Sequence, residues 1–230
     1  MPDGAALAVR LYGFNSCPLS PKLVMSLPGQ RELREFVLKE GPAELIRHWR
    51  SQRHHSRPGW LSWVRRERPR GLSEITYKLY VSPTPTSVRD VLRELVPELT
   101  ESSCIRFKVG ASPAYLARPD KLVAYFSDRQ ETLRVAEAVS RRVEGLPAQG
   151  VPFSAPVNSN RLLSWGMDPP HDPEHLMSWR TWLCSEIAKA MTACESGDRV
   201  AAAHDRLSTL GVDPDLWEPS SDIWRVHEAD

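Results

Sequence analysis

The sequence has no apolar run long enough to cross a membrane, and Met1-Pro-Asp-Gly4 lacks the basic and apolar regions of a signal peptide. It also has little net charge, since 30 basic residues stand against 29 acidic ones, which argues against a whole-protein attraction to nucleic acid or membrane. Its four cysteines are scattered without the pairing of a metal site. We therefore expect a cytoplasmic protein with reduced thiols; disulfides are the weaker alternative.

Motifs for common cofactors are absent as well. There is no G-x-x-x-x-G-K followed by Ser or Thr, no G-x-G-x-x-G after a strand, no H-E-x-x-H pair and no G-x-S-x-G elbow. His54-His55 are adjacent, and His171 and His175 lie four positions apart, but no carboxylate or cysteine is clearly placed to complete a metal site. The sequence therefore predicts no cofactor and no metal.

What the sequence does contain is a run of alternating strands and helices after residue 72. Apolar and polar residues alternate over 75–82, 104–109 and 121–126, which predicts strands. Helical stripes are expected from Val88 to near Pro97, over 133–143 before Gly145, from Asp172-Pro173 to 190, and over 200–210; a further strand is expected over 161–167. This order predicts an α+β domain over 73–230, with helices packed on one side of a mainly antiparallel sheet.

Residues 1–72 differ in character and are expected to form a small helical, basic N-terminal segment and linker. A short helix over 33–37 is broken at Gly41-Pro42, and a second helix is expected over 45–49. From Arg47 to Arg70 eight arginines are interleaved with Trp49, Trp60 and Trp63. A solvated basic linker whose tryptophans pack against the main domain is the favoured interpretation; an acidic-peptide or nucleic-acid site is the alternative.

The three strands share one further feature, which is polar or basic side chains at every second position. Successive side chains leave opposite faces of a strand, so Lys78 shares a face with Tyr80, and Arg106 shares one with Lys108. With Arg118 and Lys121 these cations could converge on a phosphoryl group, and a crowded, partly buried lysine could act as a base. The alternative is a solvent-facing row on a sheet with one wet side, which the pattern alone favours.

Several short motifs occur in a recognisable order over about residues 73–222. They are Tyr77-Lys-Leu-Tyr-Val-Ser82, Phe107-Lys108, Arg118-Pro-Asp-Lys-Leu-Val-Ala-Tyr-Phe126, Leu163-Ser-Trp-Gly166, Ser178-Trp-Arg-Thr-Trp-Leu-Cys-Ser-Glu-Ile-Ala188 and Leu210-Gly-Val-Asp-Pro214. In these the chain resembles the HopA-type effector family, whose members occur as type III effectors and in class V lanthipeptide and thioamitide biosynthesis. That family looks related to the phosphothreonine lyases, which remove phosphate by β-elimination and leave a dehydroamino acid.

The resemblance implies a role for each matched residue. Lys108 would be the general base that takes the α-proton, Lys78 a cation at the phosphate or carbonyl, and Arg118 and Arg180 the phosphate-binding arginines. Tyr80 is a departure, because the phosphothreonine lyases have there a histidine that protonates the leaving phosphate. Two more cations, expected to bind substrate from the shared-face argument alone, are Arg106 and Lys121.

Two functions of different class follow. In the first, the protein is a carbon–oxygen lyase that converts a phosphorylated Ser or Thr of a precursor peptide, primed by a kinase-like partner protein, to dehydroalanine or dehydrobutyrine. In the second, it is a non-catalytic peptide- or phosphopeptide-binding partner of a kinase or cyclase. The base-like placement of Lys108 favours the lyase. Nucleic-acid binding through Arg47–Arg70 is a third and less favoured possibility.

Overall fold

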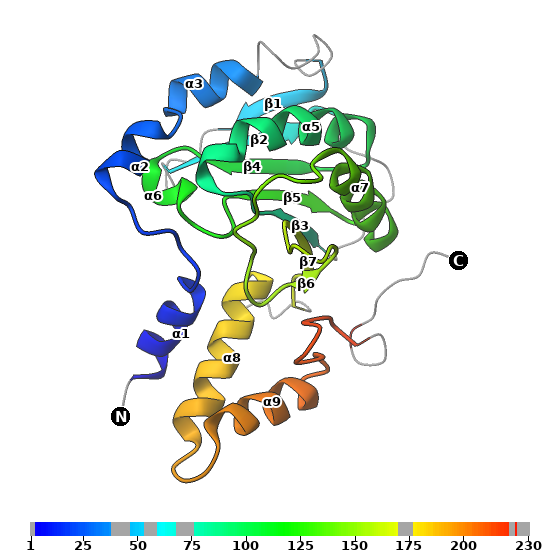
Figure 1. The fold of residues 1–230 in the computed structure, drawn as a ribbon. Helices are drawn as coiled ribbons and strands as arrows, with labels where there is room; N and C mark the ends of the chain where they lie inside the picture. The colour runs from blue at the N-terminus through cyan, green and yellow to red at the C-terminus, as the bar shows by residue number, and fades with distance from the viewer. Residues whose placement is uncertain are drawn as a thin grey trace.

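The computed structural model describes residues 3–37, 47–52, 59–67, 76–169, 177–220 and 224. Its helices and strands follow one another along the chain as shown in Figure 1. They are α1 (Gly4–Tyr12), α2 (Pro21–Ser26), α3 (Gln30–Glu35), β1 (Trp49–Gln52), β2 (Trp60–Arg65), β3 (Tyr77–Val81), η2 (Pro85–Ser87), α5 (Val88–Glu101), β4 (Arg106–Gly110), α6 (Pro113–Leu116), β5 (Leu122–Phe126), α7 (Arg129–Arg142), β6 (Ala155–Pro156), β7 (Leu163–Met167), α8 (Trp179–Ala193) and α9 (Arg199–Thr209).

The described strands form a seven-stranded sheet in the order β1-β2-β4-β5-β3-β7-β6. Neighbouring strands pair antiparallel throughout. The three strands predicted over 75–82, 104–109 and 121–126, which are β3, β4 and β5, are adjacent at its centre, and β7 flanks β3 as the fourth predicted strand. The predicted α+β fold with a mainly antiparallel sheet is confirmed.

Two strands come from the segment that was expected to be helical and linker-like. β1 pairs with β2, and β2 pairs with β4, which extends the sheet beyond its centre. The predicted helix over 45–49 is wrong at Trp49, because Trp49 lies in β1, and its ring packs edge-on to Phe107 at 4.9 Å. Arg47 and His48 are helical, as predicted, whereas residues 45 and 46 and the expected break at Gly41-Pro42 lie outside the described residues. The division into two domains at residue 72 stays a prediction, and its boundary falls between β2 and β3.

The basic stretch of this segment is partly used inside the fold. Arg65, at the end of β2, donates hydrogen bonds to the carbonyl oxygens of Leu99, Thr100, Ser102 and Cys104 at the end of α5 and just beyond it. The last carbonyls of a helix have no partner within the helix, so a cation placed there satisfies them and the helix dipole together. Arg65 is therefore a helix cap. The stretch forms strands rather than a linker at β1 and β2, but Trp49 and Trp63 do pack against Phe107, as the favoured interpretation expected of its tryptophans.

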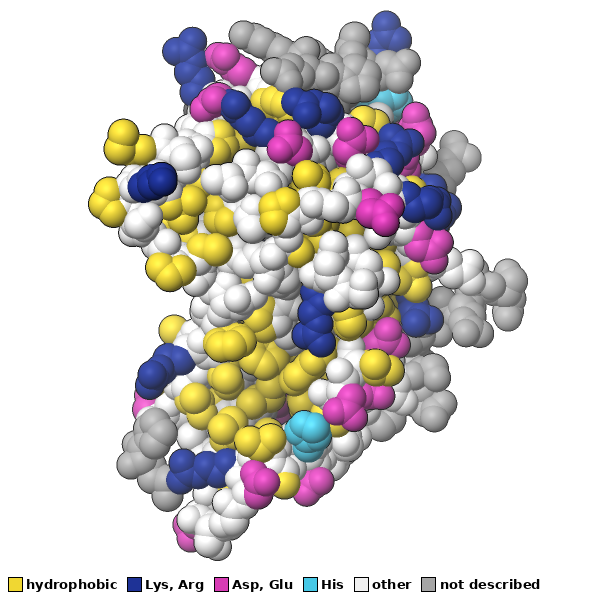
Figure 2. Space-filling view, in the orientation of Figure 1, with side chains coloured by type: hydrophobic (Ala, Val, Ile, Leu, Met, Phe, Trp, Pro, Cys, Tyr) yellow, Lys and Arg dark blue, Asp and Glu magenta, His cyan; other side chains and the backbone are white. Residues whose placement is uncertain are grey.

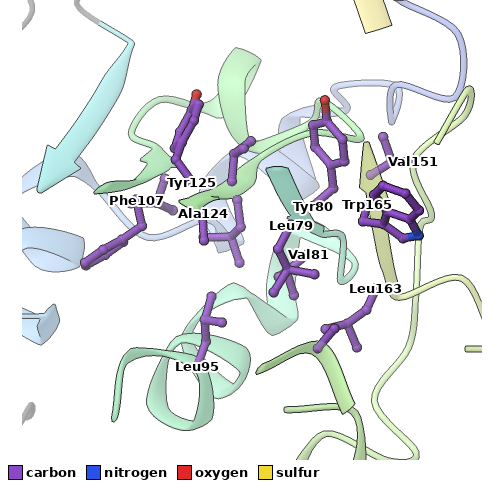
Figure 3. Packing of buried hydrophobic residues seen from close by; sticks show 14 of the residues in the cluster. Leu79, Tyr80, Val81, Leu95, Phe107, Ala124, Tyr125, Val151, Leu163 and Trp165 are labelled. Atoms are coloured by element: carbon purple, nitrogen blue, oxygen red, sulfur yellow. The ribbon is translucent and has the colours of Figure 1, made fainter. Parts of the chain in front are cut away.

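The apolar core lies between one face of the sheet and the helices α5 and α7, which cross that face in Figure 1. Leu79 and Val81 of β3 point to this side, as does Leu95 of α5 from across the interface (Figure 3). α5 was expected to end near Pro97 but continues to Glu101. It continues because Leu99, beyond the proline, is fully buried, and its packing outweighs the missing backbone hydrogen bond.

The helix α8 approaches the sheet at the end of β7 and, as Figure 1 shows, extends away from it between α1 and α9. A Cβ on Gly166 would lie 2.4 Å from the Trp179 ring, so glycine lets the first residue of α8 rest on the strand. α8 begins at Trp179, with Ser178 as its N-cap, rather than at the expected Asp172-Pro173, which itself lies outside the described residues. Within them, no helix is both long and apolar enough to span a membrane.

Candidate functional site

The register of the central strands places the predicted polar residues on one face of the sheet, opposite to the core. Tyr125 of β5 pairs with Lys78 of β3 on one side and with Arg106 of β4 on the other. Val123, two residues earlier, pairs with Tyr80 and with Lys108 in the same way. Directly paired residues project to the same face, so these side chains form one polar face, which we call the cationic face. The sequence predicted each half of it; the structure joins the halves across β5.

The cationic face is covered rather than wet. Lys78 is only 6% exposed and Tyr80 only 3%, which overturns the alternative of a solvent-facing row for these two residues. Lys78 forms an ion pair with Asp168, the residue that follows β7, and the same Asp168 oxygen accepts a hydrogen bond from the backbone N–H of Trp179 at 3.0 Å. Burial lowers the pKa of Lys78, and the Asp168 carboxylate opposes that effect. Asp168 thus ties the lysine to the first turn of α8.

Lys108 has a different environment, without a carboxylate directly on its ammonium group among the described contacts. Its Nζ lies 4.1 Å from the centre of the Trp60 ring and 5.9 Å from that of Tyr125. Burial, helped by the charges of Lys78, Arg118 and Arg106 and opposed by Asp120, lowers the pKa of Lys108 to about 7. A large fraction of Lys108 is therefore an uncharged amine at neutral pH, which is the form that can accept a proton.

Tyr80 faces Lys108 across β5. Each lies one strand away from Val123, so their Cα atoms are about 10 Å apart. Figure 3 shows the Tyr80 and Tyr125 rings pointing to the side of the sheet away from Leu95. Burial, followed by the charge of Asp168, raises the pKa of Tyr80 well above its ordinary value of 10. Tyr80 therefore stays protonated and is a weak acid.

The two predicted arginines meet at a carboxylate that the sequence did not single out. Arg118 donates to both oxygens of Asp120, at 2.9 and 3.0 Å, and Arg180 of α8 places its Nη1 3.2 Å from Asp120 Oδ2. Arg180 is buried, and its Nε donates to the carbonyl oxygen of Pro152. Although burial opposes ionisation, the hydrogen bonds of Arg118 and the charge of Arg180 hold the pKa of Asp120 well below its ordinary range. We call Arg118, Asp120 and Arg180 the arginine–aspartate unit.

The other two predicted cations differ from each other. Arg106 lies over the Tyr125 ring, with its Cζ 4.0 Å from the ring centre, and so belongs to the cationic face. Lys121 is fully buried and donates to the Pro83 carbonyl oxygen at 2.8 Å and to Gln149 Oε1 at 2.6 Å. Its ammonium group is thus engaged by two loops, and the structure does not bring it to the substrate side of the other cations.

Within the described residues, no three His, Cys, Asp or Glu side chains are arranged to hold an ion. The histidines considered for that role, His54, His55, His171 and His175, lie outside the described residues. Cys17, Cys104, Cys184 and Cys194 are all free thiols, in agreement with the predicted reduced state.

Four important residues were missed in the sequence: Tyr12, Trp60, Asp120 and Asp168. Both carboxylates stand beside motifs that were noticed, since Asp120 follows Arg118-Pro119 and Asp168 follows the β7 strand. Their partners, however, are set by contacts between distant parts of the chain. Tyr12 and Trp60 come from the first 72 residues, where no pattern linked an aromatic residue to the cations.

In comparisons with known proteins, no family model and no curated protein matches the sequence of this chain. Among solved structures, the effector protein from Pseudomonas syringae pv. tomato superposes with a TM-score of 0.61 at 13% identity over 94% of this chain and 89% of that one. An effector protein from Pseudomonas syringae pv. syringae has a TM-score of 0.53 at 14% identity, over 88% and 83%. The phosphothreonine lyase SpvC, an effector from Salmonella, has 0.46 at 16%, over 71% and 86%. The first two establish that this chain shares the fold of these effector proteins.

Proposed function

We propose that this protein, with the fold of the Pseudomonas effectors, is a phosphoserine or phosphothreonine lyase that acts on a phosphorylated peptide. The observation that supports this most directly is geometric. Lys108 and Tyr80 flank the same position of β5, and the arginine–aspartate unit lies close enough to influence both side chains electrostatically. A base, a phosphate-binding group and a protonated hydroxyl are the parts that a β-elimination needs.

The charges of the site also match a phosphate monoester. Four cations, Lys78, Arg106, Arg118 and Arg180, face two carboxylates, Asp120 and Asp168, when Lys108 is neutral. This leaves two positive charges uncompensated among these residues, which would balance the two negative charges of a phosphate dianion. Arginine provides two parallel N–H donors for phosphate oxygens, so Arg118 and Arg180 are the groups best suited to bind it.

In the proposed reaction, Lys108 Nζ takes the α-proton of the phosphorylated residue. The electron pair of the C–H bond becomes the new Cα–Cβ double bond, and the C–O bond to phosphate breaks, with its electron pair leaving on phosphate. Lys78 stabilises the negative charge that develops on the carbonyl oxygen or the phosphate. Tyr80 donates a proton to the leaving phosphate. The product is a dehydroalanine or dehydrobutyrine residue and inorganic phosphate.

The finer part of the proposal concerns the substrate. The resemblance of residues 73–222 to HopA-type proteins supports a precursor peptide of ribosomal-peptide biosynthesis, such as a class V lanthipeptide or thioamitide, which a kinase-like partner has phosphorylated in the cytoplasm. A second candidate function is favoured by Tyr80, whose raised pKa makes it a poor acid. In that case the same site binds a phosphopeptide without turning it over and presents it to a kinase or cyclase.

Mass spectrometry of phosphoserine and phosphothreonine peptides incubated with the purified protein tests the proposal. We expect loss of phosphoric acid and a thiol-reactive dehydro residue with the parent, and no product with Lys108→Ala. Lys22→Ala, at an exposed lysine of α2, controls for the loss of one positive charge and is expected to remain active. Release of phosphate that leaves a free hydroxyl group would instead identify a phosphatase. Tight binding without any product would favour the binding partner.

A further inference from the structure

A tyrosine from the first helix reaches the arginine–aspartate unit. Tyr12 is the last residue of α1, and its hydroxyl accepts a hydrogen bond from Arg118 Nη2 at 2.9 Å and donates one to Asp120 Oδ2 at 3.0 Å. Its ring lies against both guanidinium groups, with Arg180 Cζ at 4.7 Å and Arg118 Cζ at 5.3 Å from the ring centre. One side chain thus contacts all three members of the unit.

Polar contacts at its end help to fix the position of α1, whose apolar side chains are only partly buried. α1 packs along α8, but none of its residues is buried, and Val9 is 72% exposed. Figure 2 shows apolar side chains open to solvent over the region of α1 and α8. Beyond the helix, Asn15 donates to the carbonyl oxygens of Gln149 and Gly150, and Arg180 Nη2 donates to the carbonyl oxygen of Tyr12. These bonds anchor Tyr12 itself at the site.

The contacts of Tyr12 leave one arginine donor unused. Arg180 Nη1 is buried and has no hydrogen-bond partner among the described residues, although it lies 3.2 Å from Asp120 Oδ2. The ion pair is therefore close, but the geometry does not direct an N–H of Nη1 at the carboxylate. A buried donor without a partner is costly, and an oxyanion of a ligand would satisfy it. Asp120 competes with such a ligand, because both are anions next to the same two arginines.

We infer that Tyr12 is a positioning residue of the phosphate site, although it lies outside the part of the chain that resembles the HopA-type family. Its ring holds Arg118 and Arg180 beside each other. Its hydroxyl donates a hydrogen bond to Asp120, which weakens the hold of that carboxylate on the two arginines and leaves them available to phosphate. This inference rests on the phosphate-binding role in the proposed function and extends it to the N-terminal segment. The first helix is then part of the site.

Titration calorimetry with inorganic phosphate tests this inference independently of turnover. Tyr12→Phe keeps the ring and removes the hydroxyl, and we expect it to weaken phosphate binding about five- to tenfold, as for the loss of a hydrogen bond to a charged group. Tyr12→Leu removes the ring as well and is expected to weaken binding further. Tyr77→Phe is the matched control, because the Tyr77 hydroxyl is buried on the opposite face of β3 without a hydrogen-bond partner among the described residues. It is expected to bind phosphate as the parent does.

A kinetic readout separates positioning from a structural role. In Tyr12→Phe, Asp120 loses a hydrogen-bond donor, so its negative charge acts more strongly on Lys108 and raises the pKa of that lysine. The rise of kcat/KM with pH should then move to higher pH, while the melting temperature stays near that of the parent. Equal phosphate affinity in the parent and Tyr12→Phe would overturn the inference alone. Absence of phosphate binding by the parent would overturn it together with the proposed function. If the parent binds phosphate but eliminates nothing, the proposed lyase activity is wrong, and the calorimetry still tests the inference about Tyr12.

Discussion

At the scale of single residues, Lys108 illustrates how an ordinary side chain acquires an unusual property. A lysine in water has a pKa near 10.5, but Lys108 lies among Trp60, Tyr125 and three cations, and its pKa falls to about 7. Lys78, on the same face, has Asp168 as a direct partner, and Lys108 has none of that kind among the described contacts. Lys78, which is paired with a carboxylate, is suited to bind an anion, whereas Lys108, whose pKa is lowered, is suited to accept a proton.

A prediction at this scale concerns the pH dependence of the reaction. The base must be unprotonated, so kcat/KM should be low below the pKa of Lys108, rise through about pH 7 and then level off, because protonation removes the reactive form at low pH. A pH series of initial rates on a phosphopeptide measures this limb. Phosphate itself has a second pKa near 6, so the series is repeated with phosphate-binding data at each pH. A limb centred at pH 9 or above would exclude Lys108 as the base in this environment.

Most residues of the candidate site could be predicted from the sequence, but the residues that they contact could not. Alternation along β3 and β4 is enough to identify Lys78, Tyr80, Arg106 and Lys108 as members of shared faces. Asp168 pairs with Lys78 from 90 positions away, and Tyr12 meets Asp120 across 108 positions. Such pairs depend on the packing of α1 and α8 against the sheet, for which a single sequence has no local signal.

At the scale of elements, the strands and most helices of residues 76–220 follow from periodicity, because each has one face against a core. The strands β1 and β2 could not be predicted in this way, since a segment rich in arginine and tryptophan can be a linker as well as the edge of a sheet. Their inward side chains pack on Phe107, Trp49 edge-on and Trp63 face to face, and these long-range contacts decide the outcome. α5 likewise continues past Pro97 because the residues beyond the proline are buried.

A prediction at this scale concerns the contact between Gly166 of β7 and the Trp179 ring at the start of α8. Gly166→Ala would place a Cβ 2.4 Å from the Trp179 ring, so the start of α8, and Arg180 with it, must shift. We expect a loss of about 1–3 kcal/mol in the free energy of unfolding and weaker phosphate binding, measured by urea denaturation and calorimetry. Gly29→Ala is the matched control, because a Cβ there meets no atom within 4 Å. Equal urea midpoints for the two variants would show that the contact is not tight.

At the scale of the whole molecule, the near-neutral net charge conceals a strong local imbalance. Thirty basic and 29 acidic residues balance over the chain, but the site alone gathers four cations around two carboxylates. Composition could exclude a general attraction to polyanions, but it could not reveal a local one. The N-terminal segment contributes Tyr12 and Trp60 to this site and two strands to the sheet. It is therefore less separate from the rest of the chain than its composition indicates.

The last prediction links this site to the stability of the whole protein. Lys108 and Lys121 each have a pKa of about 7 in the folded state against 10.5 ordinarily, so between pH 7 and 10 the unfolded chain binds more protons than the folded one. The free energy of unfolding should therefore rise with pH in this window, by at most about 1.4 kcal/mol per pH unit for each lysine. Lys108→Met removes one contribution, and we expect a flatter dependence and greater stability than the parent at pH 7, at the expense of activity.

Urea denaturation at pH 7, 8 and 9 measures this dependence for the parent, Lys108→Met and Lys22→Met, the last at an exposed lysine and expected to follow the parent. A neutral, apolar side chain suits the surroundings of Trp60 and Tyr125 better than an ammonium group does, because no desolvated charge remains. If Lys108→Met is less stable than the parent at pH 7, the packing of Lys108 outweighs the cost of its charge. If it is more stable and inactive, the fold gives up stability to keep an amine where a proton must be taken.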